Sequence, residues 1–327
     1  MTVKIAVVIP CYKVKDHILD VIAGIGGDIV QIYAVDDHCP VGSGDFIEAH
    51  NQDRRVKVLR HAENQGVGGA VMTGYRAAIE DGMDIIVKVD GDGQMDPALI
   101  PAFVAPIASG EADYTKGNRF FDLEHIRQMP GLRLFGNGGL SFLTKLSSGY
   151  WDLFDPTNGY TAIHRDVARH LPLEKISRRY FFETDMLFRL NTLRAVVVDV
   201  PMHARYGDEV SNLKISKVMT EFLGKNLGNF AKRVFYNYYL RNLTLASFEL
   251  PVGIALTLFG LAYGIRHWLF SIDTGQVASS GTVMLAAMPV LVGVQLLLAF
   301  FGQDIASTPR LPIHPRLRRS ALKGPGA

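Results

Sequence analysis

Two aspartates and a glutamine alternate with glycines in the segment Asp90-Gly91-Asp92-Gly93-Gln94, which directly follows an apolar run rich in Ile and Val. If the backbone turns there, the side-chain oxygens of residues 90, 92 and 94 can converge on one hard cation. Oxygen ligands suit Mg²⁺ or Mn²⁺, and such an ion can hold a diphosphate. The alternative is an Asp/Gly turn with a helix cap at Asp96. Because the segment follows a strand-like run, we expect the metal site.

Polar residues also follow two other apolar runs. The first run leads into Pro10-Cys11-Tyr12 and the second into Asp36-Asp37. In parallel α/β folds ligands bind beyond the carboxyl ends of the strands, so we expect these residues at a binding site. The glycines of Gly66–Ala70 do not fit G-x-G-x-x-G and follow the third run, not the first. They predict the start of a helix packed on the sheet and not a nicotinamide-binding loop.

Strand-like and helical stretches alternate in the part of the chain that carries these residues. The expected strands are Lys4–Pro10, Asp28–Asp36, Val56–Arg60, Ile85–Asp90 and Tyr114–Asn118, and the clearest helices are Gly68–Asp81 and Ala98–Ala108. This alternation predicts an α/β fold with a mostly parallel sheet and helices on both faces.

The composition of the 327 residues excludes several classes of protein. With 34 Lys+Arg against 32 Asp+Glu the net charge is +2, and 48% of the residues are hydrophobic, which excludes a disordered chain and argues against a nucleic-acid binder. Two cysteines, Cys11 and Cys39, exclude a disulfide scaffold and favour a reducing compartment. The mean hydropathy of +0.13 is high for a soluble enzyme and indicates that apolar residues are concentrated in one place.

Two uncharged stretches near the C-terminus account for that hydropathy. Val283–Phe301 holds 19 residues without a charge, roughly 28 Å of helix, close to the ~30 Å hydrocarbon core of a bilayer. Leu250–Ile265 is also uncharged and is extended by Trp268, Leu269 and Phe270. The alternative is a pair of buried core helices. Because the two stretches follow each other, we expect a transmembrane hairpin over residues 243–305.

Basic residues flank this hairpin on both sides. The connecting segment Ser271–Thr282 has Asp273 but no Lys or Arg, whereas several Lys and Arg precede and follow the hairpin. The positive-inside rule therefore places both flanks in the cytoplasm, the second flank being a basic tail over 306–327. Residues 214–242 mix basic, aromatic and aliphatic residues at helical spacing. They predict an amphipathic helix in the headgroup layer, with an ordinary surface helix as the alternative. We expect no signal peptide, because the first apolar run is only strand-length and ends at Pro10.

Together the motifs resemble those of family 2 glycosyltransferases with a GT-A (Rossmann-like) fold. The carrying residues are Pro10-Cys11-Tyr12, Asp36-Asp37, Asn64-Gln65-Gly66 and Asp90–Gln94, in that order. Within the family the chain is most similar to the polyprenyl-phosphate (dolichol-phosphate-type) sugar synthases of the membrane-anchored bacterial type. The segments that narrow it are Lys116–Arg119, Asn158-Gly159-Tyr160, Glu183-Thr184-Asp185 and Arg205–Leu213. The resemblance implies a catalytic domain over residues 1–213.

The resemblance also implies roles for individual residues. Asp90, Asp92 and Gln94 would surround Mg²⁺ or Mn²⁺ and the donor diphosphate. The nucleotide-sugar pocket would be lined by Pro10, Tyr12, Asp36, Asp37, Asp90 and Asp92. The acceptor phosphate would meet Arg119, Arg133 and Asn137, and the catalytic set would be Asp92, Arg119 and Arg205. Three positions depart from the family pattern: Lys13-Val14 replaces a common Asn-Glu, His38-Cys39 replaces a small residue and Ser, and Gly91 replaces Ala.

The expected activity is an inverting transfer of a sugar from a UDP- or GDP-linked donor to a polyprenyl phosphate. It would take place at the cytoplasmic membrane face, most simply of a bacterial inner membrane. A phosphate acceptor is already anionic at neutral pH and needs no protein base. A hydroxyl acceptor on a glycan or lipid is the alternative and would use Glu183 or Asp185 as base. A third hypothesis is a non-catalytic protein that binds nucleotide without turnover.

The sequence ranks neither the sugars nor the two nucleotides. Gly253, Gly260 and Gly264 would let helices approach closely, either within the hairpin or between copies in a homo-oligomer.

Overall fold

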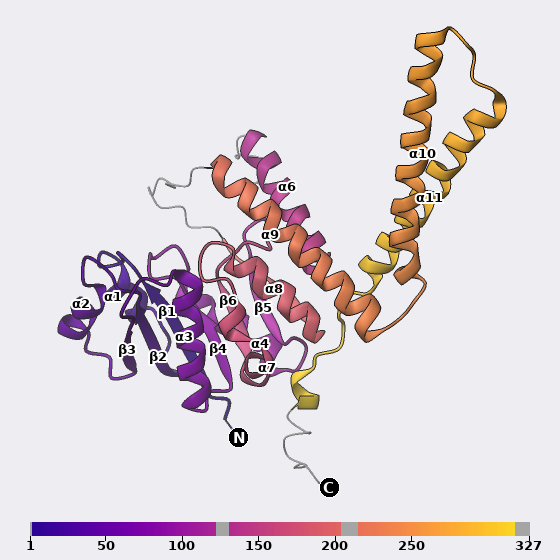
Figure 1. The fold of residues 1–327 in the computed structure, drawn as a ribbon. Helices are drawn as coiled ribbons and strands as arrows, with labels where there is room; N and C mark the ends of the chain where they lie inside the picture. The colour runs from indigo at the N-terminus through magenta and orange to yellow at the C-terminus, as the bar shows by residue number, and fades with distance from the viewer. Residues whose placement is uncertain (1, 122–130, 204–214, 318–327) are drawn as a thin grey trace. The chain divides into compact units, whose positions relative to one another are not determined.

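The computed structural model describes residues 2–121, 131–203 and 215–317, with side chains except at 131–137 and 215–219. In this part of the chain seven strands form one sheet in the order β3-β2-β1-β4-β6-β5-β7 (Figure 1). The strands are β1 (Ile5–Cys11), β2 (Ile29–Asp36), β3 (Val56–Arg60), β4 (Ile85–Lys88), β5 (Tyr114–Asn118), β6 (Thr161–His164) and β7 (Val197–Pro201). Every pair is parallel except those of β6, which runs antiparallel to β4 and β5. The predicted mostly parallel α/β sheet is confirmed.

Helices cover both faces of this sheet because the strands alternate between two cores. Ile5, Val7 and Ile9 of β1 belong to one buried cluster, and Ala6 and Val8 belong to the other. The first cluster packs against α1 (Ile18–Ala23), α2 (Ser43–His50) and α4 (Ile100–Ala108), the last of these preceded by the short helix η1 (Pro97–Leu99). The second packs against α3 (Val67–Glu80), α7 (Arg165–His170) and α8 (Phe182–Leu193). The polar strand ends are thus held between two apolar layers.

Close backbone packing explains the glycines that begin α3. A Cβ atom on Gly74 would lie 2.3 Å from the Val8 side chain, so the helix can approach β1 only without one. The N–H groups of Gly68 and Gly69 donate to the carbonyl oxygen of Arg178, and Gly66 has φ +82°, a conformation that favours glycine. The predicted helix start packed on the sheet is what the structure shows.

The chain divides into two compact units. We call residues 1–231 with 309–327 the sheet unit and residues 232–308 the hairpin unit. The helix α9 (Ile215–Phe235) begins in the first unit, where Asn229 Nδ2 donates to Asp185 Oδ1 at 3.1 Å. Asn226 of the same helix accepts from the hydroxyl of Ser147 in α6 (Gly131–Ser148) at 2.6 Å. The divisions expected at 213, 242 and 305 remain predictions.

A segment that follows the hairpin unit is part of the sheet unit. Asp113 is fully buried and accepts hydrogen bonds from the backbone N–H groups of Ile313 and His314, at 2.9 Å each, and from His314 Nδ1 at 2.8 Å. The His314 ring stacks on His164, with the ring centroids 4.2 Å apart. The buried Asp113 carboxylate therefore binds the segment that follows the hairpin unit to the sheet unit.

Acid should weaken the sheet unit through His164. Burial, with a contribution from neighbouring His314, lowers the pKa of His164 from 6.5 to about 4. The unfolded chain then binds a proton that the folded chain does not, so we expect the free energy of unfolding to fall by about 2–3 kcal/mol between pH 6.5 and pH 4. His164→Asn keeps an acceptor for the N–H of Asp166, as an N-cap residue can. Chemical unfolding at several pH values should give a shallower slope for that variant, and equal slopes would assign the titration to another group.

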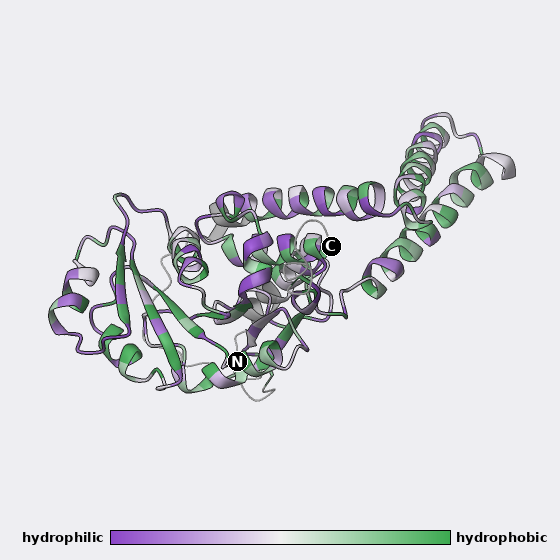
Figure 2. Ribbon diagram, turned by 90° about the horizontal axis from the view of Figure 1, so that it is seen from below, coloured by the Kyte–Doolittle hydropathy of each residue, from purple (hydrophilic) through white to green (hydrophobic). Residues whose placement is uncertain are grey.

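The hairpin unit contains two long apolar helices, α10 (Ala246–Thr274) and α11 (Ser280–Ala306). Both have the length and composition of membrane-crossing helices, and Figure 2 shows apolar residues along them. A Cβ atom on Gly253 would lie 3.0 Å from the Gly293 carbonyl oxygen, and one on Gly260 would lie 2.6 Å from that of Ala286. These two glycines therefore serve packing within the hairpin, as does Gly264, whose nearest neighbour is also Ala286.

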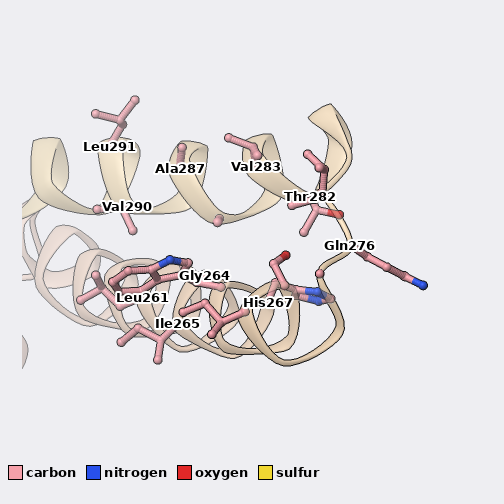
Figure 3. A pocket seen from close by; sticks show the side chains of 18 residues that line it. Leu261, Gly264, Ile265, His267, Gln276, Thr282, Val283, Ala287, Val290 and Leu291 are labelled. Atoms are coloured by element: carbon pink, nitrogen blue, oxygen red, sulfur yellow. The ribbon is translucent and has the colours of Figure 1, made fainter.

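The two helices line an apolar cavity of about 890 Å³ next to their connecting loop, and this cavity is largely open to the outside (Figure 3). Leu261 and Ile265 of α10 and Val290 of α11 contribute to its wall. All of its lining lies in the described part of the chain, and none of it is Lys, Arg, Asp or Glu. Such a cavity suits hydrocarbon and not a diphosphate.

A buried ion pair joins the last turn of α9 to the end of α11 inside the hairpin unit. Arg233 donates to both oxygens of Asp304, at 2.7 and 2.9 Å, and both side chains are almost completely buried. The hydroxyl of Tyr238, in the π-helical turn η3 (Tyr236–Arg241), donates to Asp304 at 2.8 Å. This contact ties the amphipathic segment to the second apolar helix.

Candidate active site

The backbone turns sharply after β4, as convergence of residues 90, 92 and 94 requires. Gly93 has φ +78°, and Asp92 Oδ1 accepts the N–H of Gln94 at 3.0 Å. The alternative interpretation of this segment is correct in part, because Asp96 does cap η1 through the N–H of Ala98. A turn and a cap are compatible with a cation site, because they leave the carboxylates at the carboxyl end of the strand.

Asp90 is held by a buried lysine that the sequence analysis did not single out. Lys88 Nζ lies 2.6 Å from Asp90 Oδ1, and the Lys88 side chain is 1% exposed against 28% for Asp90. A Cβ atom on Gly159 would lie 2.5 Å from Lys88 Nζ and 3.0 Å from Asp90 Oδ2. The signal was available in the sequence, because Lys88 is the one charged residue in an otherwise apolar strand.

Lys88 belongs to a row of side chains that crosses three strands. Thr161 of β6 pairs in register with Lys88 of β4 on one side and with Lys116 of β5 on the other. Lys116 is fully buried and donates to the carbonyl oxygen of Asn158; burial lowers its pKa to about 8. Half-buried Glu183 of α8 interacts electrostatically with both lysines, and burial raises its pKa. The charged groups of Lys88, Asp90, Lys116 and Glu183 thus interact with one another near the ends of these strands.

Arg119 forms an ion pair with the buried carboxylate of Asp155. Its Nε and Nη2 atoms donate to Asp155 Oδ2 at 2.7 Å and Oδ1 at 3.1 Å, and Asp155 is completely buried. Asn158 also donates to Asp155, at 3.3 Å. Nearby Asp199 has its pKa raised to about 6 by burial. Asp155 fixes the direction of the guanidinium; the contact between Arg119 and an acceptor phosphate stays a prediction.

Asp36 and Asp37 organise loops at the end of β2. Asp36 is buried and accepts the N–H groups of Cys39 and Gly44, at 2.7 and 2.6 Å. Asp37 is buried and accepts the N–H groups of Gln65 and Gly66, both at 2.7 Å, and it lies 2.7 Å from His61 Nδ1. Both carboxylates therefore shape the neighbouring loops, and a direct contact with the nucleotide stays a prediction.

Removing the Asp37 carboxylate should destabilise the sheet unit. In Asp37→Ala the partly buried N–H groups of Gln65 and Gly66 lose their acceptor. Leaving one buried donor unpaired costs about 1–3 kcal/mol, and water can reach these two donors in part, so we expect a total loss of about that size in the free energy of unfolding. Asp37→Asn keeps one acceptor oxygen and should lose less. Chemical unfolding of the three proteins measures this, and an Asp37→Ala protein as stable as the wild type would contradict it.

The remaining residues predicted for the nucleotide pocket, Pro10 and Tyr12, lie at the end of β1. Pro10 is part of β1, and Tyr12 beyond it is 45% exposed. Lys13 and His38 adopt left-handed conformations, with φ 60° and 52°, and the N–H of Lys13 donates to Cys39 Sγ at 3.1 Å. A positive φ is uncommon for residues other than glycine, so the backbone at both positions is strained. Strain of this kind is typical of binding sites.

The structure describes the side chains of the predicted bases but not those of Arg133, Asn137 and Arg205, which were predicted for the acceptor and for catalysis. Arg133 and Asn137 lie in the first part of α6, residues 131–137, whose side chains are not described, and Arg205 lies outside the described residues. Asp185 is buried and accepts from Ser177 N, Arg189 Nε and Asn229 Nδ2. These contacts give Asp185 a part in the fold, which leaves Glu183 as the better placed of the two candidate bases.

The donor atoms at the end of β4 fit a hard divalent cation. Within residues 2–121, 131–203 and 215–317 no three His, Cys, Asp or Glu side chains gather as a metal cluster. The predicted site instead consists of two carboxylates and an amide, all oxygen donors at one turn. Oxygen donors at a partly exposed strand end suit Mg²⁺ or Mn²⁺, which keep water or substrate oxygens in their coordination shell.

Comparisons with known proteins agree with this arrangement. A family model described as Glycosyl transferase family 2 matches residues 6–171. The chain is 32% identical over 168 residues to the UDP-N-acetylglucosamine–dolichyl-phosphate N-acetylglucosaminyltransferase of Methanococcus voltae, covering 51% of this chain and 66% of that protein. It is 32% identical over 174 residues to the undecaprenyl-phosphate mannosyltransferase of Micrococcus luteus, covering 53% and 70%.

A solved structure supports the fold assignment. Glucosyl-3-phosphoglycerate synthase from Mycobacterium tuberculosis, in complex with Mn²⁺, UDP and phosphoglyceric acid, superposes with a TM-score of 0.54 at 18% identity. The superposition covers 70% of this chain and 78% of that one. At this identity the likeness shows a shared GT-A-type fold.

Proposed function

The chain belongs to glycosyl transferase family 2, and on that premise we propose that it moves a sugar from a nucleotide-sugar donor to a polyprenyl phosphate, inverting the anomeric configuration. One observation carries the proposal. A single chain combines the acidic end of β4 and the anchored Arg119 with a pair of membrane-length apolar helices. The relatives named as dolichyl- and undecaprenyl-phosphate sugar transferases support the lipid phosphate as acceptor.

Transfer of a sugar to a phosphate does not require a protein side chain that acts as a base. A phosphate monoester has its second pKa near ~6, so its oxygen is anionic at neutral pH and can attack the anomeric carbon directly. The bond from that carbon to the nucleoside diphosphate breaks on the opposite side, which inverts the configuration. A bound Mg²⁺ or Mn²⁺, held by Asp90, Asp92 and Gln94, would offset the charge of the departing diphosphate. Arg119, oriented by Asp155, would hold an anionic partner in line.

Chain connectivity supports a cytoplasmic sheet unit. The sheet unit includes α9 up to residue 231 and the segment from residue 309 onward, so the chain leaves it and returns to it across the hairpin unit. Two crossings bring the chain back to the side from which it started. Since basic residues lie on both sides of the two apolar helices, the positive-inside rule supports the cytoplasm as that side.

A hydroxyl acceptor is the second candidate, and Glu183 favours it. Burial raises the pKa of Glu183, which is the direction a general base near neutral pH requires. In that reaction Glu183 would take the proton from the acceptor hydroxyl as the new bond forms. Glu183→Gln should then abolish transfer, whereas transfer to a phosphate should continue.

The test is a donor and acceptor screen with the full chain in detergent or in membrane vesicles. UDP- and GDP-linked sugars are each offered with undecaprenyl phosphate, dolichyl phosphate or the phosphate-free polyprenol, with Mg²⁺ or Mn²⁺ added. The proposal expects a lipid-phosphate-linked sugar of inverted configuration and no product from the free polyprenol. Product from the polyprenol alone would support the second candidate, and no product with any donor would exclude both.

A further inference from the structure

Lys88 forms an ion pair with one of the two oxygens of the Asp90 carboxylate. The proposed function assigns the same carboxylate to a metal ion. Lys88 Nζ lies 2.6 Å from Asp90 Oδ1, so the ammonium already neutralises that oxygen. Asp90 Oδ2 lies on the side of Gly159, where a Cβ atom would come within 3.0 Å of it. A cation at Asp90 must therefore share the carboxylate with a buried positive charge.

The structure gives Lys88 little room to move away. Its side chain is 1% exposed, between Val8 of β1 and Thr161 of β6 in the register of the sheet. A Cβ atom on Gly159 would lie 2.5 Å from its Nζ atom, so the glycine of the Asn158-Gly159-Tyr160 segment leaves the space that the ammonium fills. Lys88 is built into the sheet as a fixed neighbour of Asp90.

The ion pair lowers the negative charge that Asp90 offers to a cation. The ammonium of Lys88 offsets the charge of the Asp90 carboxylate, which gives the pair a formal sum of zero. A free divalent cation at Asp90 would therefore also lie close to the positive charge of Lys88. A nucleoside diphosphate brings the missing negative charge.

We propose that Lys88 keeps the site from binding a divalent cation on its own, so that the cation enters with the diphosphate of the donor. This inference rests on the proposed function for the use of Asp90 as a metal ligand. It gives Lys88 the role of a positioning residue that acts through Asp90. It also explains a charged residue at a fully buried position in a central strand.

The experiment is a direct titration of the full chain in detergent with Mn²⁺, following the free ion by electron paramagnetic resonance, without acceptor or sugar. The wild type should bind Mn²⁺ weakly alone and more tightly with UDP or GDP. Lys88→Met should bind Mn²⁺ alone about tenfold more tightly, since a unit charge some 6 Å from a divalent ion has roughly that effect even with water-like screening. Lys88→Arg keeps the charge and should behave as the wild type.

Lys116→Met is the matched control, because it removes a buried lysine that donates to Asn158 instead of Asp90. Its gain in Mn²⁺ affinity should be smaller than that of Lys88→Met. If Lys88→Met does not fold, Lys88→Gln removes the charge while keeping a donor, and the same gain is expected. Unchanged or weaker Mn²⁺ binding in the uncharged variants would overturn this inference and leave the proposed function intact. Tight binding of Mn²⁺ to the wild type without a nucleotide would do the same. A wild type that binds no Mn²⁺ even with either diphosphate overturns the metal site of the proposed function as well.

Discussion

Replacing Asp92 with asparagine is expected to lower the rate of sugar transfer about 10²- to 10³-fold, the usual cost of losing an electrostatic group in a catalytic site. Asparagine has the same shape and can still accept the N–H of Gln94 through its Oδ1 atom, so the turn after β4 should persist. The variant therefore removes a negative charge and little else. Initial rates at saturating donor, acceptor and metal measure the effect.

Asp96→Asn is the matched control for this experiment. Asp96 lies four residues further along the same segment and caps η1 through the N–H of Ala98, a bond that asparagine can also accept. Its transfer rate should stay within about twofold of the wild type, because N-cap asparagine and aspartate are nearly equivalent. Equal rates for Asp92→Asn and the wild type would remove Asp92 from the mechanism.

Breaking the ion pair between Arg233 and Asp304 should have the largest effect on stability. Removing one partner of a buried pair leaves an uncompensated charge and costs about 3–5 kcal/mol. Asp304→Ala is therefore expected to unfold at a lower denaturant concentration, with the loss reported by the hairpin unit. Replacing both partners, by Arg233→Met together with Asp304→Leu, should recover most of that stability.

The control for this prediction is an exposed ion pair of equal length. Lys225 Nζ and Glu221 Oε1 are also 2.7 Å apart, but their side chains are 40% and 60% exposed. Glu221→Ala should cost less than about 1 kcal/mol, because water screens such a pair. Denaturant titrations in one detergent compare the three variants with the wild type. Similar losses from Asp304→Ala and Glu221→Ala would mean that burial does not strengthen the Arg233 pair.

Local patterns were enough to predict the first five strands and the two apolar helices. Each of these elements has a run of residues whose type and period indicate one structure, as in Ile85–Lys88 and Ser280–Ala306. The strands β6 and β7 were not predicted. Thr161–His164 is four residues long and follows a polar turn, and Val197–Pro201 alternates apolar residues with an aspartate on a partly exposed edge.

The site could be predicted where one segment carries it and not where distant segments meet. The turn at Asp90–Gln94 is local, so its spacing was informative. The partners Arg119 and Asp155 are 36 residues apart, and Asp113 and His314 are 201 apart. Nothing near either residue in the chain indicates such a pairing. The inward position of Asp36 and Asp37 also depends on tertiary contacts, since only the folded loops supply the N–H groups that their oxygens accept.

In the sequence, the hairpin unit lies between two parts of the sheet unit instead of following it. This order determines how a protein without the two apolar helices has to be designed. Cutting the chain after residue 231 would remove the segment that carries Ile313 and His314, and buried Asp113 would lose several of its donors at once. A water-soluble version should instead delete residues 232–308 and join Ala231 to Pro309 through a short flexible linker. In evolution, a hairpin inserted within a domain can be exchanged or lost only if the two flanking parts of the domain can still be joined.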